Sequence, residues 1–341
     1  MPRNYLITGG AGFIGSNYVA RLLQRGEKVT VYDNLSRAGA PRNLEWLKES
    51  FGEKSFDLIV GDVRDASLIA ESAKGSDVIV HLAGQVAVTT SVANPREDFE
   101  ANALGTFNVL EAARLSGRNP IFIYASTNKV YGGMDNVTLA EEKTRWRYRD
   151  LVDGCPETQP LDFHSPYGNS KGSGDQYTRD YARIYGLRSV VFRQSCIYGT
   201  RQFGIEDQGW VAWFVIAAVT GRPITIYGDG KQVRDILWVD DLLDAYDRSI
   251  DEIDMAKGQV YNMGGGPQNV MSVWAEFGPM LEKLLGDTIE VARGDWRPGD
   301  QRVFYADIRK AEKELSWRPK VDVEEGVKKL FDWVQANKGL F

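Results

Sequence analysis

Three glycines near the amino terminus constrain this chain more than any other feature. Gly9, Gly12 and Gly15 are spaced three residues apart, between an apolar run (residues 4–8) and an amphipathic run (residues 14–25). Glycine permits a tight turn and lets another group approach the backbone, and the first turn of a helix offers unpaired N–H groups to an anion. Following a strand and opening a helix, this spacing predicts the pyrophosphate-binding turn of a dinucleotide fold. The alternative is an ordinary strand–turn–helix corner.

The first half of the chain alternates short apolar runs with helical patterns. Strands are predicted at residues 4–8, 28–32, 56–60, 77–81, 120–125 and 188–193, and helices at stretches such as 14–25 and 99–116. This alternation predicts an α/β fold, with a Rossmann-type doubly wound parallel sheet.

The second half differs, because its strands are shorter and its helices are amphipathic. Strands are predicted at 225–227, 260–262 and 289–291, and helices at 240–250, 272–285 and 324–337. We expect a cofactor domain over residues 1–195 and a smaller C-terminal α+β substrate lobe over residues 196–341, with some segments returning to the first domain. Residues 134–164 are long for a connection, which indicates a functional loop or an insertion.

Composition excludes several classes of protein. Two cysteines and two histidines in 341 residues argue against a disulfide scaffold and a metal centre, so we expect no metal. A net charge of −6 argues against nucleic acid and anionic membranes as partners. The longest apolar run, residues 210–219, is too short to cross a bilayer, and residues 2–8 do not have the form of a signal peptide. We therefore expect a cytoplasmic protein.

Two acidic residues follow predicted strands at positions that suit a dinucleotide. Asp33 lies 18 residues beyond Gly15, where a carboxylate can accept from ribose hydroxyls, and this favours NAD over NADP. Arg37 weakens that preference, because an arginine can pair with a 2′-phosphate. Asp62 follows the third strand and is expected to contact the adenine; a helix N-cap before residues 66–73 is the alternative.

Tyr167 and Lys171 are four residues apart, so a helix that begins near residue 166 places both on one face. An ammonium about 4 Å from a phenol contributes roughly 4 kcal/mol at an effective dielectric constant near 20. That would lower the phenol pKa by about three, toward 7, and make Tyr167 a proton-transfer group. Ser126 and Thr127, past the fifth strand, would supply a hydroxyl at the carboxyl edge of the sheet.

Together these residues resemble the extended short-chain dehydrogenase/reductases that act on nucleotide sugars. The resemblance extends over nearly the whole chain and rests on the glycine turn, Asp62, residues 81–84, Asn102 with residues 105–106, residues 130–132, Tyr167 with Lys171, residues 234–235 and residues 297–300. It implies NAD as the cofactor, Tyr167 as the acid/base, Lys171 as its tuning residue and Thr127 as the hydroxyl partner. Asn102 is expected to be structural.

The resemblance also implies two sets of binding residues. Cofactor-binding residues are expected to be Gly9, Gly12, Phe13, Ile14, Gly15, Asp33, Asn34, Ser36, Arg37, Asp62, Val63, Leu82, Ala83, Gln85, Ser126, Tyr167, Lys171 and Gln194. Substrate-binding residues are expected to be Thr127, Asn128, His164, Cys196, Arg201, Gln208, Val211, Tyr227, Arg234 and Arg297. For His164 a loop or helix-start hydrogen bond is an equal alternative. For the apolar stripe over residues 210–219, packing against the other lobe is favoured, and base recognition by residues 208–211 is the alternative. His81 is expected to be a buried structural residue.

The residues after Thr127 reduce the number of nucleotide-sugar reactions that the chain is expected to catalyse. Dehydratases of the family place an Asp-Glu pair where this chain has Asn128 and Lys129, so dehydration is disfavoured. Stretches at residues 33–39, 83–91, 126–132, 161–168, 207–211 and 230–235 resemble the branch of CDP-paratose 2-epimerases, also called CDP-tyvelose epimerases. The implied activity is epimerisation at C2 of a nucleotide-diphosphate hexose through a 2-keto sugar. Cys196 departs from the family, which has an asparagine there.

Three functions remain open at this stage. The 2-epimerase is favoured, and a nucleotide-sugar 4-epimerase or reductase of the same family is the main alternative. A non-enzymatic dinucleotide sensor is disfavoured, because it would not need Thr127, Tyr167 and Lys171. The resemblance also implies a homodimer or homotetramer that pairs through residues 99–116 and 171–185.

Overall fold

The computed structural model describes residues 2–297 and 300–341, so Pro298 and Gly299 of the motif at 297–300 lie outside the described residues. The chain forms two compact units. The first unit takes in the residues up to Thr127, together with Ser165–Arg193 and Leu243–Tyr261. The second takes in Asn128–His164, Gln194–Leu242 and Asn262–Phe341.

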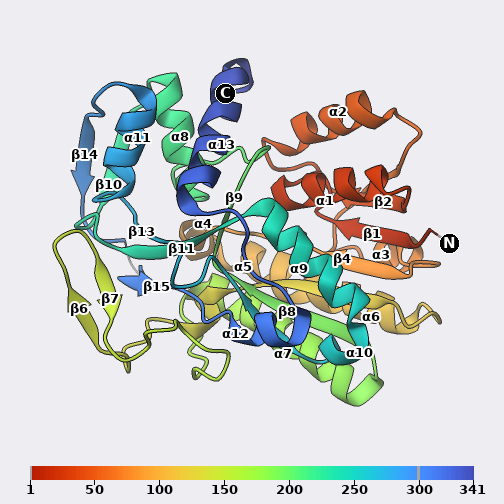
Figure 1. Cartoon of the computed structure of the whole chain (residues 1–341). Coiled ribbons are helices and arrows are strands. Elements are labelled where there is room, and N and C mark those ends of the chain that lie inside the picture. Colours follow the sequence, from red (N-terminus) through yellow and green to blue (C-terminus); the bar gives the residue numbers. More distant parts are fainter. Residues whose placement is uncertain (1, 298–299) are drawn as a thin grey trace. The chain divides into compact units, whose positions relative to one another are not determined.

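A seven-stranded sheet forms the centre of the α/β fold, as predicted (Figure 1). Its strand order is β12-β8-β5-β4-β1-β2-β3, and the neighbouring pairs from β3 to β5 are parallel. This is the order of a doubly wound sheet that reverses direction beside β1. The strands are β1 (Asn4–Thr8), β2 (Lys28–Asp33), β3 (Asp57–Val60), β4 (Val78–His81), β5 (Ile121–Thr127), β8 (Arg188–Gln194) and β12 (Val260–Met263).

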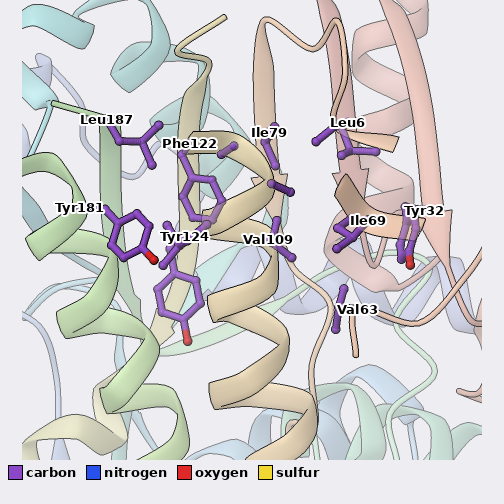
Figure 2. Packing of buried hydrophobic residues seen from close by; sticks show 14 of the residues in the cluster. Leu6, Tyr32, Val63, Ile69, Ile79, Val109, Phe122, Tyr124, Tyr181 and Leu187 are labelled. Carbon is purple, nitrogen blue, oxygen red and sulfur yellow. The ribbon is translucent and has the colours of Figure 1, made fainter. Parts of the chain in front are cut away.

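Helices of the first unit cover both faces of this sheet. They are α1 (Phe13–Gln24), α2 (Ala40–Phe51), α3 (Ala66–Ser72), α4 (Val88–Ala93), α5 (Pro95–Asp98), α6 (Gly105–Leu115), α7 (Ser165–Tyr185), α9 (Val239–Asp251) and α10 (Ile253–Ala256). On one face, buried side chains of α3, α6 and α7 pack against β1, β4 and β5, as Figure 2 shows. On the other, the ring of Tyr18 from α1 lies 5.7 Å from that of Tyr246 on α9, which in turn contacts Phe192 of β8.

Two predicted elements of this unit differ from the structure. The predicted helix over 99–116 begins with a π-helical turn, η1 (Phe99–Leu104), before α6 continues it. The strand predicted at 260–262 was expected in the smaller lobe, but as β12 it forms one edge of the seven-stranded sheet. A periodic sequence pattern does not reveal which sheet a short strand joins, because pairing partners lie far away in the chain.

The second unit combines small sheets with helices. β11 (Val233–Trp238) pairs with β9 (Cys196–Tyr198), β13 (Val270–Ser272) and β15 (Val303–Phe304). Two further pairs are β10 (Ile224–Tyr227) with β14 (Val291–Gly294), and the hairpin of β6 (Leu139–Glu141) with β7 (Trp146–Tyr148). The helices are η2 (Asn128–Tyr131), α8 (Trp210–Thr220), α11 (Phe277–Leu285), α12 (Arg309–Leu315), α13 (Val323–Ala336) and η3 (Lys338–Leu340).

Here too the structure corrects two boundaries. The helix predicted over 272–285 begins only at Phe277, because residues 270–272 form β13 and pair with β11. The strand predicted at 289–291 lies at 291–294, as β14. The apolar helix α8 packs against α11, α13 and β10 of its own unit. No helix within the described residues is long and apolar enough to cross a membrane.

Candidate functional site

The glycine turn connects β1 to α1 and is too tight for side chains. Gly9 has a φ of 71°, and its amide donates to Tyr32 O at 2.8 Å. A Cβ on Gly15 would lie 2.2 Å from Gly9 O, and a Cβ on Gly9 would lie 2.7 Å from Ala83 N. The N-cap of α1 is Gly12, which has no side chain to accept from the first-turn amides. The turn therefore leaves a helix N-terminus open to an anion, beside Phe13 and Ile14, and fits a dinucleotide pyrophosphate.

Asp33 ends β2 and supports the glycine turn. Its carboxylate accepts from Ala11 N at 3.0 Å and from Leu35 N at 2.8 Å. Burial raises the pKa of Asp33, and these backbone donors lower it. In the loop that follows, Asn34 accepts from Ser36 N at 3.1 Å, while Ser36 and Arg37 are exposed.

Asp62 is engaged by its neighbours. Its carboxylate accepts hydrogen bonds from Asn34 Nδ2 at 2.9 Å and from two guanidinium nitrogens of Arg64. The pairing with Arg64 lowers the pKa of Asp62. The alternative in which Asp62 caps a helix is wrong, because Asp65 caps α3 by accepting from Ser67 N and Leu68 N. Val63 belongs to the buried core (Figure 2), so only its backbone remains for a ligand.

The segment after β4 is held by Asn102. Leu82 N donates to Thr8 O, and Ala83 follows next to the glycine turn. Gln85 N donates to Asn102 Oδ1 at 2.9 Å, and Asn102 Nδ2 donates to Gln85 O at 3.1 Å. This pair of hydrogen bonds to the Gln85 backbone gives Asn102 the expected structural role.

Four predicted residues come together where β5 ends and α7 begins. Ser126 and Thr127 end β5, while Tyr167 and Lys171 are buried on one face of α7. Tyr167 N donates to Ser91 Oγ at 3.1 Å, which anchors the start of this helix. A hydrogen bond joins the side chains of Thr127 and Tyr167. A phenol and a hydroxyl in contact, with a buried ammonium one turn away, can transfer a proton to or from an alcohol.

The expected lowering of the Tyr167 pKa is not found in the structure. Burial raises the pKa of Tyr167 to about 12, and the charge of Asp98 acts in the same direction; the hydrogen bond with Thr127 and the charge of Arg37 oppose this rise. The Lys171 ammonium lies over the ring of Tyr124, 4.4 Å from its centroid, and burial lowers the pKa of Lys171 to about 8. The prediction counted the charge of the lysine and neglected the desolvation of both groups.

His81 is a satisfied structural residue, as expected. Its Nδ1 lies 2.7 Å from Thr8 Oγ1 and its Nε2 lies 3.0 Å from Thr106 Oγ1. Burial, with the charge of Lys171, lowers the pKa of His81 to about 3, so the ring is neutral.

In the second unit, Arg234 belongs to a cluster of polar side chains. Arg234 is 6% exposed and pairs with Asp300 at 2.6 Å. Asn128 and Lys129 both reach Gln301 Oε1 at 3.4 Å. Burial lowers the pKa of Lys129 to about 8, and the charge of Arg234 acts in the same direction. Two cations near one anion give this cluster the chemistry to hold a phosphate group.

Cys196 belongs to the same cluster. Its Sγ accepts from Trp210 Nε1 at 3.3 Å. Burial raises the pKa of the Cys196 thiol, while the charge of Arg234 opposes the rise. The thiol is therefore protonated at neutral pH, as suits a packing residue rather than a nucleophile.

Arg297 and Tyr227 form a second group in this unit. The Arg297 guanidinium lies 3.9 Å from the centroid of the Tyr227 ring and pairs with Asp207 at 3.0 Å. The Tyr227 hydroxyl donates to Glu206 at 3.0 Å. The planar guanidinium of Arg297 has the donor geometry that binds phosphate oxygens.

The remaining predicted residues are spread over the second unit. Arg201 lies over the ring of Trp333, 5.7 Å from its centroid. His164 is exposed, and at the start of α7 Gly168 N donates to Ser165 Oγ at 3.2 Å. Gln208 bridges to Ile205, Val211 is buried in α8, and Gln194 ends β8.

Sequence reasoning missed a buried network behind the reacting residues. Arg193 makes two hydrogen bonds of 2.9 Å to Asp175, which also accepts from Ser126 Oγ at 2.8 Å. Asp98 accepts from Asn102 Nδ2 at 3.1 Å. The i, i+4 spacing of Lys171 and Asp175 was visible in the sequence, but the partners on other elements were not.

Comparisons with known proteins agree with this geometry. The family described as GDP-mannose 4,6 dehydratase matches residues 6–330. The CDP-paratose 2-epimerase of Salmonella typhi is 45% identical, over 97% of this chain and 99% of that protein. A solved UDP-glucose 4-epimerase of Thermotoga maritima with UDP-glucose is 32% identical with a TM-score of 0.83, covering 98% of this chain and 99% of that one. A solved double mutant of the dTDP-glucose 4,6-dehydratase DesIV of Streptomyces venezuelae with NAD bound is 30% identical with a TM-score of 0.84, covering 99% and 98%.

Proposed function

The chain belongs to the family described as GDP-mannose 4,6 dehydratase, and on that ground we propose that it is an epimerase that inverts C2 of a nucleotide-diphosphate hexose of the CDP-paratose/CDP-tyvelose type. The observation that carries the choice of C2 is the 45% identity, over nearly the full length of both chains, to a CDP-paratose 2-epimerase. A 4-epimerase and a dehydratase among the relatives are each about a third identical to this chain.

The cofactor is NAD, and the first unit has the residues to hold it. Gly9, Gly12 and Gly15 leave the start of α1 open to a pyrophosphate, and Asp33 lies at the end of β2, where a carboxylate repels a 2′-phosphate. When bound, NAD supplies the acceptor that takes a hydride from the sugar and returns it.

The chain's own residues manage the proton. Tyr167 takes the proton of the sugar hydroxyl as the alcohol becomes a ketone, and gives it back when the alcohol re-forms. The Thr127 hydroxyl, hydrogen bonded to that phenol, orients the same oxygen. Lys171, one helical turn away on α7, is the proposed tuning residue of this phenol. Such positioned acid–base catalysis contributes roughly 10²–10⁴ in rate.

Arg234 and Arg297 are the proposed ligands of the nucleotide diphosphate. Arg234 is buried beside Lys129, and Arg297 lies over Tyr227. Asn128 and Lys129 provide no carboxylic acid for the elimination of water, which argues against dehydration.

The test is to incubate the purified protein with CDP-paratose, without added cofactor, and to follow the sugar by NMR. We expect inversion at C2 by NAD that copurifies with the protein. Inversion at C4 of another nucleotide sugar would favour the 4-epimerase, and turnover that consumes added NADH would favour the reductase. NAD binding without any turnover would favour the sensor. Arg234→Ala should weaken nucleotide-sugar binding far more than NAD binding.

We also propose that the protein pairs with a second copy through η1, α6 and α7. Seven large side chains on these elements are between 39% and 67% exposed: Phe99, Leu104, Phe107, Leu115, Tyr177, Ile184 and Tyr185. The rings of Phe107 and Tyr177 lie 6.0 Å apart, which joins α6 and α7 into one apolar face. Light scattering should give a dimer or tetramer for the wild type and a monomer for Tyr177→Glu. Val60→Glu, on the exposed end of β3, is the control.

A further inference from the structure

The charges of two carboxylates act on buried Lys171, and both raise its pKa against the effect of burial. Asp98 ends α5 and is 1% exposed; Asp175 lies one turn beyond Lys171 on α7 and is fully buried. Lys171 itself is 7% exposed. An ammonium removed from water needs a compensating negative charge to stay protonated, so the two carboxylates must be compared.

Asp175 is already paired with an arginine. Arg193 binds it through two hydrogen bonds of 2.9 Å, and Ser126 and Gln176 donate to it as well. Both members of this ion pair are buried. Its charge is therefore partly offset, and of the two carboxylates that raise the pKa of Lys171, Asp98 has the larger influence and Asp175 the smaller.

Asp98 has no such partner. Its Oδ1 accepts from Asn102 Nδ2 at 3.1 Å, and within residues 2–297 and 300–341 its Oδ2 has no hydrogen-bond partner. No cation in that part of the chain forms an ion pair with Asp98 within 4.0 Å. Burial raises the pKa of Asp98; hydrogen bonding with Ser170, the charge of Lys171 and the hydrogen bond from Asn102 lower it, in that order.

Asn102 fixes Asp98 relative to Lys171. Its Nδ2 donates to Asp98 Oδ1 and also to the hydroxyl of Ser170, each at 3.1 Å, and Ser170 directly precedes Lys171. Asn102 lies in the π-helical turn η1, and such turns often occur at functional sites. One amide thus ties the carboxylate to the helix that carries the lysine.

The other titratable groups near Lys171 carry no free negative charge. On β4, burial lowers the pKa of His81 to about 3, so that ring is neutral. On β5, burial raises the pKa of Tyr124, and on α7 the pKa of Tyr167 is raised to about 12, so both phenols are protonated at neutral pH. With Asp175 paired to Arg193, Asp98 on α5 is the stronger of the two negative charges that act on Lys171.

We propose that Asp98 is the through-space counter-charge that keeps Lys171 in its ammonium form, and hence a positioning residue for Tyr167 and its proton transfer. The titration of Lys171 is a property of the protein alone. The consequence for catalysis rests on the proposed function.

The direct test measures the protonation of Lys171 in the whole protein without substrate. The rate of Lys171 acetylation by acetic anhydride is followed against pH by mass spectrometry. In Asp98→Asn the midpoint should fall by roughly one pH unit or more, as for the loss of a nearby opposite charge. Glu97→Gln is the matched control, because it removes an exposed carboxylate from the same helix. The Lys171 midpoint in this variant should equal that of the wild type. An unchanged midpoint in Asp98→Asn would overturn the proposal.

Kinetics separate this proposal from the proposed function. If the wild type inverts C2, the alkaline limb of its kcat profile should move to lower pH in Asp98→Asn and return in Asp98→Glu. If the wild type does not epimerise but the acetylation midpoint moves, the proposed function fails and the role of Asp98 stands. If the wild type epimerises and neither midpoint nor limb moves, the role of Asp98 fails.

A stability comparison covers the case in which Asp98→Asn does not fold. Lys171→Met leaves Asp98 as a buried charge without compensation, so adding Asp98→Asn to that variant should raise its Tm. A buried charge left without its partner is strongly destabilising, whereas removal of both charges is tolerated. A double variant no more stable than Lys171→Met would contradict the proposal.

Discussion

Acid should destabilise this protein through His81 in a way that can be calculated. His81 is fully buried between Thr8 and Thr106, and its pKa in the folded protein is lowered to about 3. In the unfolded chain a histidine titrates near pH 6.5. The unfolded state therefore binds a proton that the folded state excludes. This contribution to stability is fully present above about pH 6.5 and is lost as the pH falls toward 3.

The magnitude follows from these two values. Between pH 7.5 and pH 5.0 the protonation of His81 should cost about 2 kcal/mol of unfolding free energy. His81→Gln keeps groups that can bond the two threonine hydroxyls but does not titrate, so it should lose about 2 kcal/mol less over the same interval.

Urea unfolding followed by circular dichroism at both pH values measures this difference. His164→Gln is the control, because His164 is exposed and its replacement should leave the wild-type pH dependence unchanged. If wild type and His81→Gln lost the same stability between pH 7.5 and pH 5.0, the reasoning would be refuted.

Three further changes have defined outcomes. Tyr167→Phe should lower kcat roughly 10²–10⁴-fold, because it removes the acid/base, while the purified protein retains its NAD. Turnover and cofactor content are measured, and a near-normal kcat would exclude the acid/base role of Tyr167. Gly15→Ala should cost roughly 1–3 kcal/mol in urea unfolding, because its Cβ would lie 2.2 Å from a backbone oxygen, whereas Gly339→Ala, with open space around it, should cost little. Arg193→Met should cost roughly 3–5 kcal/mol by leaving Asp175 buried without its cation, and a loss below 1 kcal/mol would show that the pair contributes little.

The central sheet could be predicted from the sequence because its signals are local. The run over residues 4–8 is β1 to the residue, and α7 begins at Ser165, next to the predicted start. The joining of β12 to this sheet and the hairpin of β6 and β7 could not be predicted, because they depend on pairing with distant or weakly periodic segments.

At the candidate site, the motifs located the side chains but not their energetics. Spacing placed Tyr167 and Lys171 on one helical face, yet the desolvation that raises the Tyr167 pKa depends on the packing of several elements. The environment of Asp98 depends on a π-helical turn, and no residue pattern is known that predicts such a turn. The roles of the binding residues remain predictions that the experiments above address.

The most direct test of the proposed chemistry is the fate of a hydrogen at C2. Given a nucleotide sugar deuterated at C2, the protein should return the deuterium to C2 of the inverted product, because the same hydride leaves and comes back within one bound complex. Mass spectrometry and NMR of the product in ordinary water would read this out. Loss of deuterium to water, or inversion at a carbon other than C2, would contradict it.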